Sequence, residues 1–200
     1  MKIVSTFEHY ELLIEEGNDP VQDPPILQAY MSSWDGPHFF DSLVPENKLV
    51  LDIGIGTGRI AKEVLSAGCK YLVGIDISPK TLERAKLNLE KYSNIELLKS
   101  DISRFVRPNT FDVAYSVLTF LHIEDKEQAL LNIYNSLNDH GVFILSVSKD
   151  DEWLECNGRR TKLYPISVEE YIHLFQAVGF TIESVQETES KYATIIKGVK

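Results

Sequence analysis

The residues whose types and spacing most clearly indicate a chemical function lie in the stretch LVLDIGIGTGR, at positions 49–59. An apolar run there ends in Asp52 and is followed by three alternating glycines, Gly54, Gly56 and Gly58. Because glycine has no Cβ and tolerates positive φ, it stands where a ligand or another backbone comes close. In an open α/β sheet, ligands bind beyond the carboxyl ends of the strands. The pattern therefore indicates a ligand site at the end of a buried strand.

The spacing of the glycines indicates which classes of nucleotide ligand could bind this turn. A triphosphate-binding loop ends in Gly-Lys followed by Ser or Thr, whereas Arg59 follows Gly58 in this chain. A dinucleotide-binding turn has the pattern GxGxxG, whose third glycine lets a helix pack closely on the strand. Counted from Gly54 and Gly56, that third position is Arg59. A triphosphate is excluded, and an NAD-dependent oxidoreductase remains as the weaker alternative.

Two further carboxylates follow strand-like stretches. Asp76 ends the apolar run YLVGIDI, about 20 residues after the glycines, where an acidic side chain can accept hydrogen bonds from both ribose hydroxyls. Asp101 ends the next stretch, IELLKSD. These positions predict that both carboxylates share the ligand edge with the glycine turn.

Taken together, these motifs resemble class I S-adenosylmethionine-dependent methyltransferases. The resemblance covers residues 48–148 through D-x-G-x-G-x-G, VGIDIS, LLKSDIS and FDVAYSVLTFLHI in the family's order, and residues 167–200 through their topology. It implies that the methionine end of S-adenosylmethionine lies over the glycines near Asp52, that Asp76 holds the ribose and that Asp101 faces the adenine. The implied cofactor-binding residues are Asp52, Gly54, Gly56, Thr57, Asp76, Ile77, Asp101, Ile102 and Ser116, with Tyr30 and Trp34 as an aromatic pocket wall. For these two aromatic residues, a place in the core is the alternative.

His122 is the candidate catalytic base. It follows the fourth predicted strand, and histidine titrates near neutral pH, which suits removal of a proton from a neutral amine, oxygen or thiol acceptor. A packing or orienting role for this histidine is the alternative. Among the other histidines, His38 would face the pocket if the segment before residue 48 acts as a lid.

Recognition of the acceptor is expected from the segment after the fifth predicted strand. It holds the basic cluster of Arg159, Arg160 and Lys162, and an Asn-Gly pair that suggests a small hairpin. The forked guanidinium of Arg159 suits a substrate carboxylate or phosphate, and Tyr164 would close the same wall. A solvated turn is the alternative reading of this cluster.

The elements that must position these residues alternate between strand and helix patterns from residue 48 onward. Such alternation predicts a doubly wound α/β fold with helices on both faces of a mostly parallel sheet. The stretches at 181–188 and 192–200 are separated by only three residues, too few for a crossover helix, so they predict an antiparallel hairpin. Together with the resemblance, this predicts seven strands, of which the last is antiparallel.

The length of 200 residues predicts one domain. We expect an N-terminal helical lid or cap at 1–47, a cofactor-binding core at 48–148, a substrate-side insertion at 149–166, and a C-terminal helix and hairpin at 167–200. A net charge of −10 disfavours nucleic acid as a partner, and the expected partner is a small-molecule methyl acceptor.

Composition and local patterns add expectations about location and chemistry. Two distant cysteines support neither a disulfide framework nor a metal site, and carboxylates in the first 16 residues do not suit a signal peptide. No apolar run is long enough for a membrane span, so a cytoplasmic enzyme is expected. The predicted activity is methyl transfer from S-adenosylmethionine to an O, N or S nucleophile of a small metabolite. A non-catalytic S-adenosylmethionine-binding sensor or partner module is the second alternative.

Overall fold

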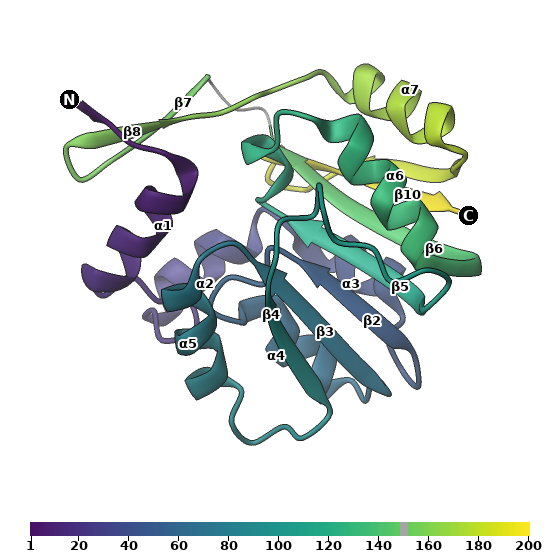
Figure 1. The fold of residues 1–200 in the computed structure, drawn as a ribbon, viewed down its shortest axis with the longest axis horizontal. Coiled ribbons are helices and arrows are strands. Elements are labelled where there is room, and N and C mark those ends of the chain that lie inside the picture. Colours follow the sequence, from purple (N-terminus) through teal and green to yellow (C-terminus); the bar gives the residue numbers. More distant parts are fainter. Residues whose placement is uncertain (149–151) are drawn as a thin grey trace.

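The computed structural model describes residues 1–148 and 152–200, and the side chains of residues 36–38 are outside the described part. A seven-stranded sheet runs through the molecule in the order β4-β3-β2-β5-β6-β10-β9 (Figure 1). Only β10 runs antiparallel to its neighbours, between β6 and β9. The strands are β2 (Leu49–Ile53), β3 (Tyr71–Asp76), β4 (Ile95–Lys99), β5 (Phe111–Val117), β6 (Leu137–Ser148), β9 (Thr181–Glu187) and β10 (Ala193–Val199). The predicted doubly wound sheet with a reversed last strand is confirmed.

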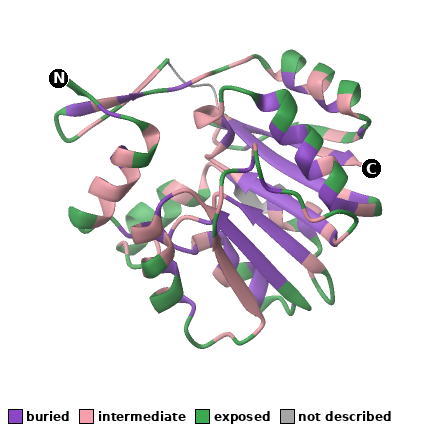
Figure 2. Cartoon of the chain, viewed as in Figure 1, coloured by how far each residue is buried: buried purple, intermediate pink, exposed green. Residues whose placement is uncertain are grey.

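Helices cover both faces of this sheet. They are α1 (Thr6–Glu15), α2 (Pro25–Ser32), α3 (Gly36–Leu43), α4 (Arg59–Ser66), α5 (Pro79–Asn88), the 3₁₀ turn η1 (Phe120–His122), α6 (Lys126–Ser136) and α7 (Val168–Val178). Helices α6 and α7 pack in one hydrophobic cluster and α3 and α4 in the other. Side chains of a strand alternate between the faces, so Val50 lies in the second cluster and Leu51 in the first. The central strands β2, β3, β5, β6 and β10 are accordingly the most buried part of the chain, whereas the edge strands β4 and β9 are less buried (Figure 2).

Residue types that favour helix ends cap helices α5 and α7. Ser78 caps α5 by accepting a hydrogen bond from the Thr81 N–H, and a reciprocal capping box joins Ser167 and Glu170 at α7. Gly179 ends α7 in the left-handed conformation. These caps are formed by residues close together in the sequence.

The end of α6 differs from its sequence pattern. In the sequence, apolar residues recur at helical spacing through Leu137, and Gly141 follows as a stop signal, a pattern typical of a helix that ends near Gly141. In the structure, α6 ends at Ser136 and β6 begins at the next residue. Leu137 is fully buried and pairs with Phe111 of β5, so burial in the sheet overrides the helical pattern. Gly141 instead lies inside β6, where a Cβ would come within 2.8 Å of the Asn138 carbonyl oxygen.

A second sheet of three strands, in the order β1-β8-β7, connects the N-terminal segment predicted as a cap with the segment predicted as a substrate-side insertion. The hairpin of β7 (Trp153–Cys156) and β8 (Arg159–Lys162) turns at Asn157 and Gly158, both at positive φ. The strand β8 also pairs in parallel with β1 (Lys2–Ile3), which leads directly into α1. This unit lies next to α1, at the upper left of Figure 1. Residues 149–151 of the predicted insertion lie outside the described residues.

Within the described chain, none of the helices has the length and apolar character needed to cross a bilayer.

Candidate functional site

A cavity of about 580 Å³ opens at the carboxyl edge of the large sheet, bounded by the turns after β2, β3 and β5 and by the N-terminal segment. The small-molecule sites of proteins usually have volumes of this order. The predicted residues that line it are Asp52, Gly54, Gly56, Thr57, Asp76, Ile77, Asp101, Ile102 and His122. The fold therefore brings nine of the sequence-predicted site residues to one cavity.

The glycine turn after β2 forms the floor of this cavity. Gly54 has φ +75°, and a Cβ there would lie 2.0 Å from the Thr119 hydroxyl, so the turn packs directly on the loop after β5. Gly56 has φ +58°, but its Cβ direction is open apart from the Gly54 carbonyl oxygen at 4.0 Å. Close packing against Thr119 explains why position 54 is a glycine. Gly56 instead leaves its backbone surface open beside the cavity.

Asp76 connects the turn after β2 with the turn after β3. Its Oδ2 accepts a hydrogen bond from the Gly56 N–H at 3.1 Å, and its Oδ1 accepts one from the Ser78 N–H at 2.9 Å. Burial raises the pKa of this carboxyl, while the backbone donors act in the opposite direction. The hydrogen bonds orient the carboxylate at the cavity wall.

Asp52 lies deeper, 3% exposed, at the end of β2. The Tyr115 hydroxyl donates to its Oδ2 at 2.6 Å. Burial raises the pKa of Asp52 to about 7, and the nearby charge of Asp76 adds to the rise, whereas the Tyr115 hydrogen bond opposes it. The neighbouring Thr57 Oγ1 is buried and has no hydrogen-bond partner among the described residues.

Asp101 and Ile102 follow β4 and line the same cavity. The exposed Asp101 accepts a hydrogen bond from the Ser103 N–H through Oδ1 at 2.8 Å. Ile102 is buried, and its carbonyl oxygen accepts a hydrogen bond from the Asn132 side chain of α6 at 2.8 Å. Helix α6 thus fixes the backbone at this end of the cavity.

His122 meets a residue that the sequence did not single out. The Tyr10 hydroxyl of α1 lies 2.7 Å from His122 Nε2, the two rings meet edge to face, and both residues line the cavity. Burial, followed by the nearby positive charges of His9 and Lys126, lowers the pKa of His122 to about 4. The imidazole is therefore neutral at neutral pH. No local sequence signal marks Tyr10, because its partner is 112 residues away.

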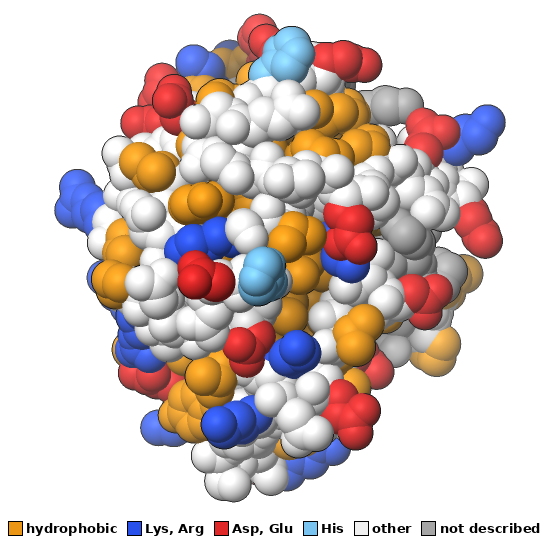
Figure 3. Space-filling view, turned by 90° about the vertical axis from the view of Figure 1, so that its right-hand side faces the viewer, with side chains coloured by type: hydrophobic (Ala, Val, Ile, Leu, Met, Phe, Trp, Pro, Cys, Tyr) orange, Lys and Arg blue, Asp and Glu red, His pale blue; other side chains and the backbone are white. Residues whose placement is uncertain are grey.

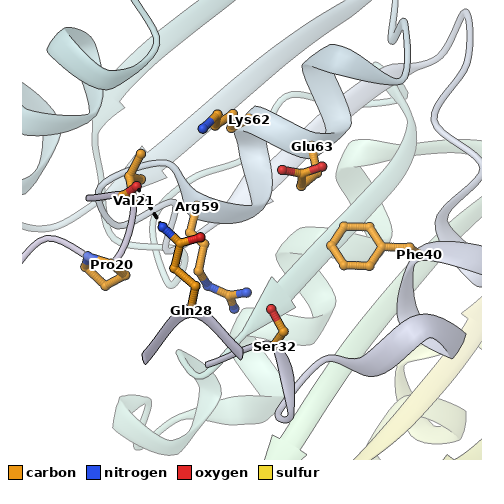
Figure 4. Close-up of a pocket in the computed structure, with 8 residues that line it drawn as sticks. All are labelled: Pro20, Val21, Gln28, Ser32, Phe40, Arg59, Lys62 and Glu63. Carbon is orange, nitrogen blue, oxygen red and sulfur yellow. Dashed lines mark hydrogen bonds between the residues drawn. The ribbon is translucent and has the colours of Figure 1, made fainter. Parts of the chain in front are cut away.

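Arg59 separates the main cavity from a smaller one of about 320 Å³. Its guanidinium donates two hydrogen bonds to Asp35, at 2.9 and 3.2 Å, and Asp35 is fully buried. Figure 4 shows the smaller cavity between the Arg59 side chain, the Gln28 side chain that donates to the Val21 carbonyl oxygen, and Phe40. The positive charge nearest the glycine turn is thus already paired within the protein.

Several predicted contacts lie away from the main cavity. Ser116 is fully buried and donates to the Ile53 carbonyl oxygen at 2.9 Å. Tyr30 and Trp34 pack around Tyr192 at the β9–β10 turn. The Ser33 carbonyl oxygen accepts a hydrogen bond from the Ser190 hydroxyl at this turn, and the Trp34 carbonyl oxygen accepts one from the Ser146 hydroxyl of β6. Ser116, Tyr30 and Trp34 are not among the described residues that line the main cavity.

The residues predicted to bind the substrate are also not among the described residues that line the main cavity. The Arg159 side chain pairs with Glu16 and does not reach the cavity. Tyr164 is held through its backbone, since its N–H donates to the Leu121 carbonyl oxygen and its own carbonyl oxygen accepts from Lys126. His38 begins α3, and its side chain is outside the described part of the chain.

Comparison with known proteins points to one family. The family model described as "Methyltransferase domain" matches residues 51–145. A carboxy-S-adenosyl-L-methionine synthase of Staphylococcus epidermidis is 30% identical over 125 residues, which cover 60% of this chain and 54% of the relative. An uncharacterized methyltransferase of Oceanobacillus iheyensis is 26% identical over 197 residues, covering 97% of this chain and 73% of the relative. The chain spans about half the length of the first curated relatives that it matches.

Solved structures share the fold at low identity. The N-methyltransferase NodS of Bradyrhizobium japonicum, crystallised with S-adenosylhomocysteine, aligns with a TM-score of 0.73 at 18% identity, covering 98% of this chain and 99% of that one. The magnesium protoporphyrin IX methyltransferase of Synechocystis, crystallised with S-adenosylmethionine, gives 0.74 at 18% identity, covering 97% and 94%. At this identity the likeness concerns the fold.

Proposed function

We propose that this chain is a class I S-adenosylmethionine-dependent methyltransferase, which binds S-adenosylmethionine in the 580 Å³ cavity and methylates a small metabolite. The observation that carries the proposal is the convergence of Asp52, the glycine turn, Asp76 and Asp101 on one cavity. A carboxylate at each of three adjacent strand ends gives separate partners for an ammonium group, ribose hydroxyls and an adenine amino group.

The residues at this edge suit the cofactor chemically. The open Cβ direction of Gly56 leaves room for a ligand against the backbone, and the buried, unpartnered Thr57 Oγ1 needs a polar partner. Asp52 suits the cationic amino group of the methionine portion, since a nearby positive charge favours its ionised form. Asp76 would hold the ribose and Asp101 the adenine.

When bound, S-adenosylmethionine supplies a methyl group on a sulfonium for in-line displacement. The protein contributes mainly by holding the acceptor in attack geometry and excluding water. His122 is neutral, so its imidazole can accept a proton from the acceptor, and the hydrogen bond between Tyr10 and Nε2 orients the ring. Tyr10 and His122 are therefore the proposed acceptor-side pair.

We infer a small acceptor that carries no net negative charge. Six carboxylates line the cavity, and the guanidinium of Arg59 is already bound to Asp35; the six are Asp23, Asp52, Asp76, Asp101, Glu124 and Asp125. An anionic acceptor would meet this negative lining, and among the described lining residues the one Lys or Arg side chain, Arg59, is already paired. Relatives named as acting on different substrates include the ribosomal protein L11 methyltransferases and NodS, so the acceptor class is argued from the cavity itself.

A nucleic-acid acceptor finds little support on the molecular surface. On the face that Figure 3 shows, Lys and Arg side chains lie singly among acidic and uncharged ones instead of gathering into a stripe. Binding to a phosphate backbone requires such clustered positive charge.

Calorimetric titration with S-adenosylmethionine and S-adenosylhomocysteine tests the proposal. Binding of both, followed by release of S-adenosylhomocysteine with members of a metabolite library enriched in amines, would support it. Cofactor binding without turnover on any acceptor would favour the non-catalytic binding module. Thermal stabilisation by NAD and not by S-adenosylmethionine would overturn the proposal in favour of an oxidoreductase.

A further inference from the structure

A cluster made of the buried His9 and Arg159 and the more exposed Glu16 joins helix α1 to the β7–β8 hairpin outside the cavity. Arg159 is only 5% exposed and His9 only 1%. The Arg159 guanidinium donates to both carboxylate oxygens of Glu16, at 2.8 Å from its Nη2, and its Nε–H donates to His9 Nδ1 at 3.3 Å. A buried guanidinium with its donors used in this way is a structural connection and not a substrate-binding group.

The cluster determines how α1 is rotated about its axis. His9 and Glu16 are seven residues apart and so lie on one face of the helix, where Arg159 contacts both. On another face Glu11 accepts hydrogen bonds from the Ser78 hydroxyl and the Lys80 N–H of α5. Successive residues of a helix are about 100° apart, so Tyr10 projects between these two attachments.

In this orientation of α1, the Tyr10 side chain contacts His122. The His9 and Tyr10 rings meet edge to face at 5.3 Å, and the Tyr10 and His122 rings do the same at 5.3 Å. At the start of α1, β1 pairs with β8 and the Thr6 and Thr161 hydroxyls lie 3.4 Å apart. The hairpin therefore holds both the start and the end of the helix that carries Tyr10.

We propose that Arg159 is a positioning residue, which sets the rotation of α1 through His9 and Glu16 and thereby holds Tyr10 against His122. The significance of the pair for the acceptor rests on the proposed function, whereas the positioning itself does not. The hairpin thus shapes the acceptor end of the cavity through α1, without lining it.

The test follows the titration of the His122 ring by NMR, with the resonance assigned from a His122→Asn variant, in Arg159→Met and Glu16→Ala proteins. Loss of positioning removes Tyr10 from the imidazole and admits water, so the pKa of His122 rises from about 4 toward the ordinary histidine value; we expect a rise of about one unit or more in both variants. Lys126 and His9, the other groups whose charge bears on His122, are present in every protein compared.

The two variants distinguish positioning from a direct effect of charge. Removing the Arg159 cation raises the pKa of His122 through space, whereas removing the Glu16 anion lowers it. Movement of α1 predicts a rise in both, and no larger rise in the double variant, because both changes break one connection. A fall in Glu16→Ala, or an unchanged titration in both folded variants, would overturn the proposal.

Two controls complete the design. Lys2→Met removes an exposed ion pair with Glu8 from the same unit and should leave the His122 titration unchanged. The affinity for S-adenosylhomocysteine should stay within about threefold in all variants, since the cluster touches none of the proposed cofactor residues. If Arg159→Met does not fold, Glu16→Ala decides the result alone. If the wild-type protein binds no S-adenosylhomocysteine, the proposed function fails while the titration still decides the positioning role.

Discussion

Replacing Asp76 by alanine should weaken the binding of S-adenosylhomocysteine by about fivefold to 150-fold. The carboxylate accepts hydrogen bonds from the Gly56 and Ser78 N–H groups, which hold it at the cavity wall. Its loss leaves buried ribose hydroxyls without partners, at a cost of about 1–3 kcal/mol, and each 1.4 kcal/mol is a tenfold change in affinity. The same substitution should lower the free energy of unfolding by about 1.5–3 kcal/mol, because a backbone donor loses its charged acceptor.

Asp112→Ala is the matched control for this experiment. Asp112 also accepts from a backbone N–H, that of Leu49 at 2.9 Å, and from the Asn138 side chain at 2.8 Å, but it lies at the opposite edge of the sheet. Calorimetry and urea unfolding should find both variants destabilised and only Asp76→Ala deficient in binding. Equal affinities in Asp76→Ala and the wild type, or an equal loss in Asp112→Ala, would refute the assignment.

Three further predictions concern the glycine turn, a buried carboxyl and a helix cap. Gly54→Ala places a Cβ 2.0 Å from the Thr119 hydroxyl at φ +75°, and should cost about 1–3 kcal/mol in urea unfolding; Gly68→Ala, at φ +82° with no atom within 4 Å, should cost less. The pKa of Asp52 is raised from 3.8 to about 7, so the folded state holds a proton that the unfolded state has lost. The free energy of unfolding therefore falls as the pH rises from about 4 to 7, and Asp52→Asn should flatten this slope. Ser167→Ala removes half of a capping box and should lower the free energy of unfolding by about 1 kcal/mol with S-adenosylhomocysteine affinity unchanged.

The sequence predicted the cofactor side of the site because its signals are local. The glycine turn, Asp76 and Asp101 each follow a strand whose apolar pattern is readable, and parallel strands bring their carboxyl ends to one edge. The caps at Ser78 and Ser167 are local in the same sense. Where sheet burial competed with a local pattern, as at Leu137, the pattern alone gave the wrong helix end.

The acceptor side could not be read in this way, because long-range side-chain contacts build it. Tyr10 meets His122 across 112 residues, and Arg159 meets Glu16 across 143. Arg159 and Tyr164 were assigned to substrate from charge and residue type, which do not reveal that the first is buried in an ion pair and the second held by its backbone. Tyr30 and Trp34 were assigned from their aromatic character, which serves equally for packing on Tyr192.

The cofactor end and the acceptor end of the proposed site should respond differently to substitution. Asp76 and Asp101 follow strands held by continuous backbone pairing in the central sheet, so their positions depend on the stability of the whole fold. Tyr10 depends on α1, whose attachments to the hairpin and to α5 are individual side-chain contacts at Arg159 and Glu11. Such contacts contribute about 0.5–3 kcal/mol each, far less than the pairing of a sheet. Substitutions in α1 or the hairpin should therefore alter which acceptors are methylated at little cost in cofactor affinity, whereas substitutions at the strand ends should reduce methylation of every acceptor together.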